Sequence, residues 1–135
     1  MIGIKIQVRR YKTKDEGLLF TLLKREGHEW EDYWKNANKE KYKKALKNSV
    51  TYLLFKEDEL CGYARCRHDD GYGLYIYDLL VDKKHRGNGY GRMLMEKAAS
   101  DFPDEPTYVM SDVDEYYEKL GYEKEGSIMI VNRGI

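Results

Sequence analysis

The chain has 135 residues, which is the usual size of one domain and is long enough to bury a core. It carries 24 Lys and Arg residues against 24 Asp and Glu residues, so its formal net charge is zero. A neutral balance gives no bias toward nucleic acid or an anionic membrane, and no stretch approaches the roughly 20 apolar residues of a membrane span. We therefore expect one domain over residues 1–135, in the cytoplasm, without a leader segment and without nucleic-acid or membrane partners.

The N-terminal part of the chain is expected to form a strand and a helix. Apolar residues alternate with other residues in the period of a half-buried strand, at Ile2, Ile4, Ile6 and Val8. Thr13 and Glu16 have the spacing of a capping box and predict a helix start, and Gly27 is the expected stop. The helix should bury a stripe of leucines, namely Leu18, Leu19, Leu22 and Leu23.

Residues 28–38 show no clean period, although both tryptophans of the chain, Trp30 and Trp34, fall there among three carboxylates. Two interpretations stay open. The segment is either a mobile flap that lays aromatic and acidic groups over a substrate, or an irregular loop anchored by two buried indoles. A helix follows over about 38–48, with Tyr42, Ala45 and Leu46 facing inward.

The remaining pattern alternates strands and helices. Strands are predicted over residues 50–55, 60–67, 73–81 and 107–110, helices over 89–100 and 114–120, and a final strand pair over 122–125 and 128–132 that turns at Gly126. The expected order is β-α-α-β-β-β-α-β-α-β-β. Hairpins are antiparallel, whereas the strand–helix–strand unit around Gly89 needs a parallel crossover. We therefore predict an α/β (α+β mixed) fold, with a mixed, mostly antiparallel sheet flanked by helices.

Two cysteines, Cys61 and Cys66, lie five positions apart on one predicted strand. Side chains alternate along a strand, so the thiols should point to opposite faces and a disulfide between them is implausible. Free thiols fit a reducing cytosol. No group of His, Cys, Asp and Glu residues has metal-ligand spacing, so no metal site is expected.

The most informative stretch is a basic, glycine-rich loop between a strand end and a helix. Gly87, Gly89 and Gly91 alternate there, so the backbone is free to curve with its N–H groups turned inward. The helix N-terminus behind the loop adds a partial positive charge. Together with Arg86 and Arg92 at the rim, the loop is typical of a site for a phosphorylated ligand.

Two nucleotide-binding patterns do not fit this loop. A Walker loop requires a lysine and a hydroxyl residue after its second glycine, and neither is present. A Rossmann fingerprint has a different glycine spacing and lies early in a βαβ unit. What remains is the pattern Arg86-x-x-Gly89-x-Gly91 behind a strand that ends at Val81.

These residues resemble the GCN5-related N-acetyltransferase (GNAT) superfamily, which uses acetyl-coenzyme A as co-substrate. The first matching motif is Leu79-Leu80-Val81-Asp82 followed by Arg86-Gly87-Asn88-Gly89-Tyr90-Gly91-Arg92. The second is Tyr116-Tyr117-Glu118-Lys119-Leu120-Gly121-Tyr122. The predicted order of elements matches the family along nearly the whole chain, and Gly62 lies in a strand where such proteins often carry glycine.

The resemblance implies a role for each matched position. Residues 86–92 would bind the pyrophosphate of the cofactor through backbone N–H groups, and the backbone of Leu79, Leu80 and Val81 would pair with the pantetheine arm. In this fold the strand that carries these residues separates from its neighbour to admit that arm. Tyr117 matches the tyrosine that protonates the leaving thiolate, and its ordinary pKa of about 10 suits that role.

The general base is not evident from the sequence. The position where several relatives carry a glutamate or histidine is Tyr75. Simple alternation puts Tyr75 and Tyr77 on one face of the strand and Asp78 on the other, unless a bulge turns it. A water chain shaped by the two tyrosines is therefore an alternative to a side-chain base. The asparagine that relatives often carry before the last helix is Met110 here.

The sequence predicts an acetyl-CoA-dependent N-acetyltransferase that acts on a small-molecule or peptide amine. Four aromatic residues are the candidate acceptor contacts, namely Trp30, Trp34, Tyr75 and Tyr77. The alternative is a non-catalytic acyl-CoA-binding or regulatory module on the same fold, and a nucleotide binder is a third interpretation. Dimers are common in the resembling family, so a homodimer stays open.

Overall fold

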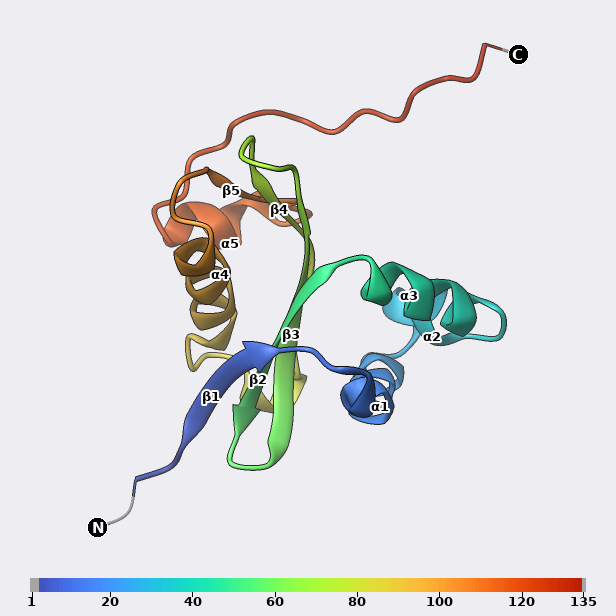
Figure 1. Cartoon of the computed structure of the whole chain (residues 1–135), viewed down its shortest axis with the longest axis vertical. Helices are drawn as coiled ribbons and strands as arrows, with labels where there is room; N and C mark the ends of the chain where they lie inside the picture. Colours follow the sequence, from blue (N-terminus) through green and yellow to red (C-terminus); the bar gives the residue numbers. More distant parts are fainter. Residues whose placement is uncertain (1–2, 135) are drawn as a thin grey trace.

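The computed structural model describes residues 3–134 and is built on a five-stranded sheet in the order β1-β2-β3-β4-β5. The strands are β1 (Ile6–Arg10), β2 (Val50–Lys56), β3 (Glu59–His68), β4 (Leu74–Val81) and β5 (Thr107–Val109). The first four strands pair antiparallel, and β5 joins β4 in parallel. The parallel step is made by the expected crossover helix, and the mixed, mostly antiparallel sheet is confirmed (Figure 1).

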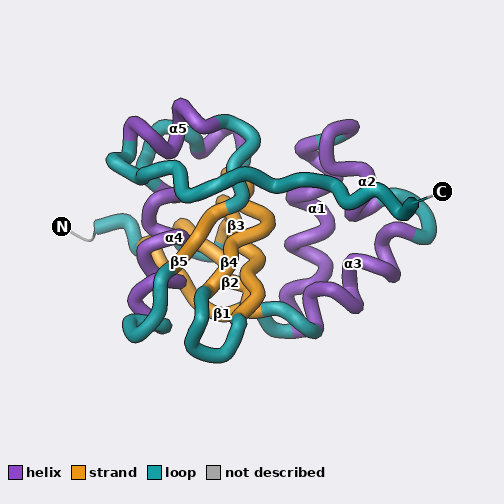
Figure 2. The backbone as a smooth tube through the Cα atoms, turned by 90° about the horizontal axis from the view of Figure 1, so that it is seen from above, coloured by secondary structure: helices purple, strands orange, loops and turns teal. Residues whose placement is uncertain are grey.

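Helices cover both faces of this sheet. They are α1 (Glu16–Glu26), α2 (Glu31–Trp34), α3 (Asn38–Lys47), α4 (Tyr90–Asp101) and α5 (Asp114–Lys119). The first three lie on one face, and α4 and α5 lie on the other (Figures 1 and 2). None of the helices in residues 3–134 has the length and apolar character needed to span a bilayer.

The sheet separates two hydrophobic cores. The core under α1–α3 contains Leu19, Leu22, Leu23, Tyr42, Leu46, Leu53, Tyr63 and Leu80. The core under α4 contains Tyr52, Leu54, Cys61, Ala64, Cys66, Leu74, Ile76, Leu94, Met95 and Ala98. Burial of apolar surface on both faces explains why β2 and β3 read as nearly continuous runs of buried residues.

Both thiols are free, but they lie in the same core and do not point to opposite faces. The prediction failed because β3 contains a β-bulge. Leu54 of β2 faces Gly62 and Phe55 faces Leu60, so Cys61 is an extra residue without an opposite partner. One extra residue resets the alternation of side chains, and Cys61 and Cys66 then fall on one side.

The start of the first helix also differs from the prediction. A 3-10 turn over Thr13–Asp15 precedes α1 in place of the Thr13–Glu16 cap, and the Asp15 carboxylate accepts the backbone N–H of Lys12 at 2.8 Å. The same carboxylate forms a bidentate pair with Arg9 of β1, with both N···O distances at 2.8 Å. It therefore ties the helix start to the sheet, which a local capping pattern does not reveal.

The buried stripe of α1 differs from the prediction at one position. Leu18 is 49% exposed, whereas Phe20 is buried beside Leu19, Leu22 and Leu23. The strand pattern of the N-terminus is confirmed from Ile6 onward, Ile4 is exposed before the strand begins, and Ile2 lies outside the described residues. Gly27 ends the helix with φ 88°, as expected.

The segment with the tryptophans consists of a 3-10 turn (His28–Trp30) and the short helix α2. The Trp34 indole N–H donates to the carbonyl of Gly27 at 3.1 Å. Trp30 packs edge-on against Tyr63, with ring centroids 6.3 Å apart. Both indoles are half-buried against the core under α1–α3, which favours the anchored-loop interpretation over a mobile flap.

The final strand pair, predicted over residues 122–125 and 128–132, is wrong. Residues 122–134 form no strand, and the chain runs away from the sheet as an extended tail (Figure 1). A two-stranded hairpin without further packing is only marginally stable, and its first arm is held elsewhere. Lys124 pairs with Asp114 of α5 at 3.4 Å, and the Tyr122 N–H caps α5 at the carbonyl of Tyr117.

Candidate functional site

The glycine-rich loop begins at Asp82, which is buried and fixed on two sides. Its backbone N–H donates to the carbonyl of Cys61 at 2.8 Å, continuing the β3–β4 pairing. Its carboxylate pairs with Arg25 of α1 at 2.6 Å and accepts the N–H of Lys84 at 3.3 Å. The loop therefore starts from a rigid point at the end of β4.

The loop then turns through two residues in the left-handed region, Gly87 with φ 84° and Gly89 with φ 79°. Only glycine adopts these angles without steric cost. The first helical hydrogen bond of α4 runs from the Met93 N–H to the carbonyl of Gly89 at 3.0 Å. Among residues 3–134, no backbone acceptor faces the six N–H groups from Gly87 to Arg92. Such a row of free donors at a helix N-terminus is a cradle for an anion.

The third glycine of the motif has a different role. Gly91 is helical, and a Cβ atom there would lie 2.7 Å from the hydroxyl of Tyr116 in α5. Gly62 of β3 is a stricter case, because its Cβ would lie 2.7 Å from the backbone carbonyl of Leu80. These two glycines allow close packing around the loop and do not provide turn geometry.

The Arg86 side chain is engaged by other groups of the chain. Its Nε donates to the carbonyl of Val81 at 2.9 Å, and its guanidinium pairs with Glu26, a nearly buried carboxylate at the end of α1. Arg86 therefore ties the loop to α1. Arg92 is exposed and makes only a long contact of 3.4 Å with Glu96, so it is the arginine available at the rim.

His85 and Asn88 also hold the loop internally. His85 is buried and pairs with Glu59 through Nε2 at 3.0 Å. Hydrogen bonds from His85 and Lys84 lower the pKa of Glu59 to about 2. The amide of Asn88 donates to the carbonyl of His85 at 2.9 Å.

The expected separation of strands is present between β4 and β5. Their parallel pairing covers only residues 74–76 of β4 against 107–109 of β5, and the last bond runs from Met110 N–H to Ile76 O at 2.9 Å. From Tyr77 to Val81 β4 continues without β5 beside it. The backbone of Leu79, Leu80 and Val81 thus borders an opened edge next to the loop, where an extended ligand arm can pair with it.

A β-bulge in β4 decides where the candidate base residues point. Arg65 of β3 faces Asp78 and Cys66 faces Ile76, which leaves Tyr77 without an opposite partner. The bulge reverses the alternation, so Asp78 lies on the α1–α3 side with Leu80, while Ile76 lies in the core under α4. Simple alternation predicted the opposite face for Asp78.

Asp78 is 5% exposed and belongs to a hydrogen-bonded network, hereafter the Asp78 network, with Arg65, Tyr33, Tyr42 and Tyr63. One carboxylate oxygen accepts from Arg65 Nε at 2.5 Å and from the Tyr42 hydroxyl at 2.6 Å, and the other accepts from Tyr33 at 3.1 Å. Burial and the charge of Asp78 raise the pKa of Tyr33 to about 12 and the pKa of Tyr42 well above its ordinary value. The carboxylate is thus engaged by three donors.

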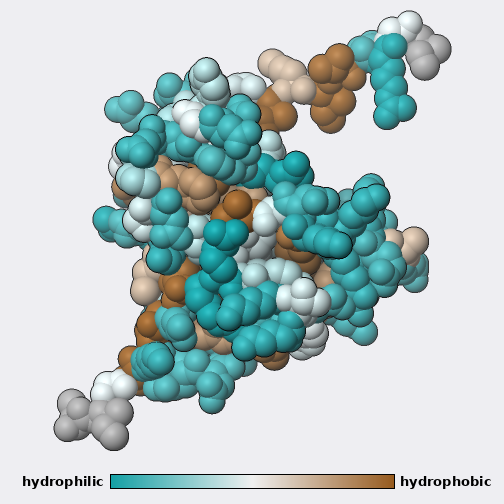
Figure 3. All heavy atoms as spheres, in the orientation of Figure 1, coloured by the Kyte–Doolittle hydropathy of each residue, from teal (hydrophilic) through white to brown (hydrophobic). Residues whose placement is uncertain are grey.

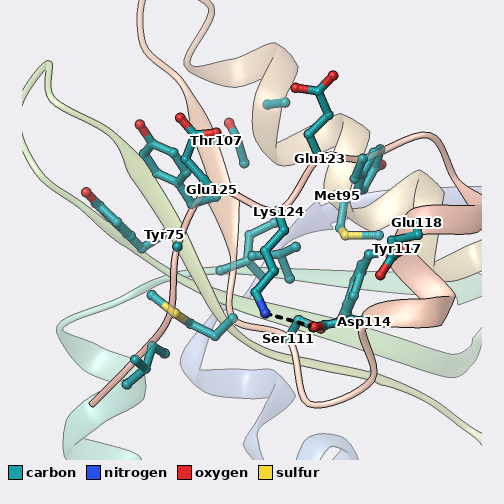
Figure 4. Close-up of a pocket in the computed structure, with 18 of the residues that line it drawn as sticks. Tyr75, Met95, Thr107, Ser111, Asp114, Tyr117, Glu118, Glu123, Lys124 and Glu125 are labelled. Carbon is teal, nitrogen blue, oxygen red and sulfur yellow. Dashed lines mark hydrogen bonds and ion pairs between the residues drawn. The ribbon is translucent and has the colours of Figure 1, made fainter. Parts of the chain in front are cut away.

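Tyr117 lies in a cavity of about 1010 Å³ that is lined by α4, β5, α5 and the beginning of the tail. Its ring packs edge-on against Tyr116 and stacks on Tyr122, with centroids 4.9 and 6.5 Å away. Burial is the main cause that raises the pKa of Tyr117 to about 12, so the phenol stays protonated at neutral pH. Figure 4 shows Tyr75 and Tyr117 on opposite sides of this cavity.

The structure brings together some of the predicted site residues and separates others. Tyr75 and Tyr117 share the large cavity, together with Met110, Ser111 and Asp114. Tyr75 also lines a smaller cavity of about 550 Å³ with Tyr77, Arg65 and Arg67 on the α1–α3 side. Trp30 and Trp34 line neither of these two cavities, and neither do residues 79–92.

The sequence interpretation missed the partners of Asp78 altogether. The available signal was Arg65, a charged residue in the middle of a strand of otherwise buried side chains, since such a charge needs an opposite charge nearby. The tyrosines that complete the network come from α2, α3 and β3, and no local pattern links them to β4.

The chain matches the family model described as Acetyltransferase (GNAT) family over residues 16–122. GCN5-related N-acetyltransferase 2, chloroplastic, of Arabidopsis thaliana is 32% identical over 75 residues, which are 52% of this chain and 29% of that protein. An uncharacterized N-acetyltransferase of Pyropia yezoensis is 28% identical over 102 residues, 68% of this chain and 59% of that protein. The chain thus spans less than two thirds of the length of either relative.

Solved structures show the same fold. A GNAT-family acetyltransferase from Streptococcus pneumoniae TIGR4 has a TM-score of 0.70 at 22% identity, covering 97% of this chain and 99% of that chain. An aminoglycoside N-acetyltransferase in complex with CoA has a TM-score of 0.72 at 13% identity, covering 99% and 98%. The glycine loop, the opened edge of β4 and the matched family model agree with the resemblance seen in the motifs. The chain therefore belongs to the acetyltransferase (GNAT) family.

Proposed function

We propose that this chain is an N-acetyltransferase, a single domain over residues 1–135 that moves an acetyl group directly from coenzyme A to a primary amine. The observation that carries the proposal is the row of free N–H groups from Gly87 to Arg92 beside the opened edge of β4. Acetyl-CoA supplies an activated acyl group as a thioester, and its pyrophosphate matches such a row of donors. The residues present therefore fit this co-substrate.

The loop and the strand bind different parts of the co-substrate. The six N–H groups, including those of Asn88 and Tyr90, hold the pyrophosphate, and Arg92 adds positive charge at the rim. Arg86 holds the loop in place through its hydrogen bonds to Val81 and Glu26. The backbone of residues 79–81 pairs with the pantetheine arm, and an N–H near Leu80 or Val81 stabilises the oxyanion that develops on the acetyl group.

Tyr117 acts as the acid in this proposal. Its phenol remains protonated at neutral pH because its pKa lies at about 12, so it can donate a hydrogen bond to the leaving sulfur. The Tyr117 ring lies in the cavity that also contains Val109 and Met110, the end of β5 where the strands separate. This places the phenol on the α4 side of the opened edge.

No side chain of β4 is assigned as the base. The Asp78 carboxylate is occupied by Arg65, Tyr42 and Tyr33, and an ordinary tyrosine such as Tyr75 is a poor base at neutral pH. We assign proton removal from the acceptor ammonium to water. Tyr75 and Tyr77 shape the acceptor side, and Trp30 and Trp34 support the helices behind it. A small-molecule or peptide amine is the proposed acceptor.

Calorimetry with acetyl-CoA tests the co-substrate site. Gly89→Glu puts a like charge against the pyrophosphate and a side chain at φ 79°, so we expect binding to weaken at least about 100-fold, which corresponds to about 2.7 kcal/mol. Ser100→Glu adds the same charge at the exposed end of α4 and serves as the matched control. Equal affinity of the Gly89 variant and wild type would contradict the proposed site.

Thiol release from acetyl-CoA with a panel of amines tests the catalytic step. Tyr117→Phe keeps the ring and removes only the donor, so kcat should fall about 100-fold while acetyl-CoA affinity stays unchanged. If wild type binds acetyl-CoA but acetylates no amine in the panel, and the substitution changes nothing, the enzyme proposal fails.

The second candidate function is a non-catalytic acyl-CoA-binding or regulatory module. The engaged Asp78 carboxylate favours it, because β4 then offers no free side-chain base. A nucleotide binder is separated from both by titrating ATP and NAD beside CoA. For location, we propose a reducing compartment such as the cytoplasm, which the two free buried thiols support.

A further inference from the structure

The outer edge of β5 is a row of backbone groups without a partner strand. Pro106 O accepts from Leu74 N–H, and Met110 N–H donates to Ile76 O, each at 2.9 Å. Alternate residues of a strand serve opposite neighbours, so Thr107 and Val109 direct their N–H and C=O groups away from β4. Among residues 3–134 no strand lies on that side, because β5 ends the sheet. Such an edge readily accepts a further strand.

The large cavity lies along this open edge. Its walls come from β5, from α4 and α5, and from residues 122–128 of the tail (Figure 4). Several lining groups are apolar, among them Met95, Val109 and Met110. The Thr107 hydroxyl is buried there without a hydrogen-bond partner in the described part of the chain. A strand added to β5 would therefore cover apolar side chains and satisfy the backbone groups of Thr107 and Val109.

The tail carries a strand sequence that has no partner. Between Ser127 and Asn132 it contains four consecutive apolar residues without a charge, which is typical of a buried strand. In the structure these residues are bare to solvent, with exposed fractions of 69% for Ile128, 81% for Met129, 98% for Ile130 and 83% for Val131. Figure 3 shows the apolar tail standing away from the body of the protein.

The tail is directed away from the edge of its own sheet. Its first part is fixed to α5, where Tyr122 N–H donates to Tyr117 O at 3.1 Å and Lys124 pairs with Asp114. Beyond this anchor the chain passes over the top of the sheet toward the side of α1 and α2 (Figures 1 and 2). One chain thus has both an unpaired strand and an unpaired edge, and they point apart.

We propose that two copies of this chain exchange their tails, so that residues 127–132 of each copy pair with the β5 edge of the other. The arrangement is reciprocal, as a two-fold dimer requires, because each copy supplies one strand and one edge. It covers exposed apolar side chains of each tail and gives the β5 edge of each copy a partner strand. A second copy is the occupant because the complementary strand is part of this same sequence.

The exchange completes the cavity that holds Tyr117. The tail of the partner copy would close the side of this cavity along β5, so each candidate acid would lie in a site formed by two chains. This consequence rests on the proposed function, whereas the dimer itself does not depend on acetyl transfer. Its test is therefore independent of any activity measurement.

Light scattering coupled to size exclusion gives the first test. Wild type should have about twice the chain mass of 16.0 kDa. Ile130→Lys puts a charge into the exchanged strand and should shift the protein to the monomer. Tyr72→Lys changes another exposed apolar residue, in the turn before β4, and should leave the dimer intact. A monomeric wild type, or a dimer that Ile130→Lys leaves unaffected, overturns the proposal.

Disulfide trapping distinguishes exchange between chains from folding back within one chain. Chains with Val109→Cys are mixed and refolded with chains carrying Met129→Cys or Ile130→Cys, which sample both faces of the strand. The chains are refolded with their thiols reduced and are oxidised only after folding, when the native cysteines are fully buried and do not compete. A disulfide between two different chains is the expected product. A link that forms only within a single chain carrying both substitutions overturns the exchange.

Discussion

Replacing Asp78 by asparagine removes the single carboxylate that faces Arg65 in the Asp78 network. Arg65 is 14% exposed and keeps its charge, since the hydrogen bond and charge of Asp78 raise its pKa against the opposing effect of burial. The variant therefore leaves a largely buried guanidinium uncompensated and weakens the short hydrogen bond from Tyr42. Breaking a buried pair from one side costs about 3 to 5 kcal/mol.

The lower part of that range applies here, because the amide oxygen of asparagine still accepts a hydrogen bond and Arg65 also donates to Ser49. We expect a loss of about 3 kcal/mol in the free energy of unfolding. For a chain of 135 residues this corresponds to a decrease in Tm of about 10 °C. Urea unfolding followed by circular dichroism measures the loss directly, and calorimetry measures the shift in Tm.

A double-mutant cycle with Arg65→Met shows whether the loss arises from the pair. Each single variant should be destabilised, and the double variant should lose about 1 to 3 kcal/mol less than the sum of both. The acid limb of the pH–rate profile should not move in Asp78→Asn, because the carboxylate is engaged and is not the base. Additive losses, or a cost of less than about 1 kcal/mol for Asp78→Asn, would refute the reasoning about the pair.

Three further predictions concern packing, pH and the loop. Gly62→Ala forces a Cβ to within 2.7 Å of a backbone carbonyl in β4 and should cost about 2 kcal/mol in urea unfolding, whereas Gly126→Ala, with open space around it, should be neutral. The paired guanidinium lowers the pKa of Asp15 below its ordinary value, so its stabilisation exists above about pH 4 and disappears as the pH falls. The Tm difference between wild type and Asp15→Asn should therefore be large at pH 7 and should shrink as the pH falls below about 4. Arg86→Gln should weaken acetyl-CoA binding about ten-fold without changing the salt dependence of Kd, while Arg92→Gln should reduce that dependence; the reverse assignment would show that Arg86 contacts the phosphates.

Local patterns were sufficient for most elements of the fold. Apolar runs and turn signals located β2, β3, β4 and β5, and the stripes and stop signals located α1, α3 and α4, each to within one or two residues. The glycine loop could also be predicted from the sequence, because the positive φ at Gly87 and Gly89 is a local backbone conformation that glycine favours. The family resemblance followed from the same short stretch, and the family match confirms it.

The orientation of the site was decided by the tertiary structure. The bulges at Cys61 and Tyr77 arise from how one strand pairs with the next, and each reverses the faces of all residues behind it. That reversal turned Asp78 toward Arg65, and long-range pairing joined Arg86 of the loop to Glu26 of α1. The spacing of apolar residues along the sequence contains no information about which strand or which charge a residue will pair with.

In the tail, too, the sequence determines one property and the tertiary structure another. The sequence alone determined that residues 128–132 have the apolar, uncharged composition of a strand. In the structure the apolar residues of this segment are exposed. Whether such a segment forms a strand depends on a neighbouring edge within reach, because a strand gains its hydrogen bonds and buried area only from another strand. The anchor of Lys124 on α5 and the open edge of β5 are features of the folded chain, and they decide where this strand can be used.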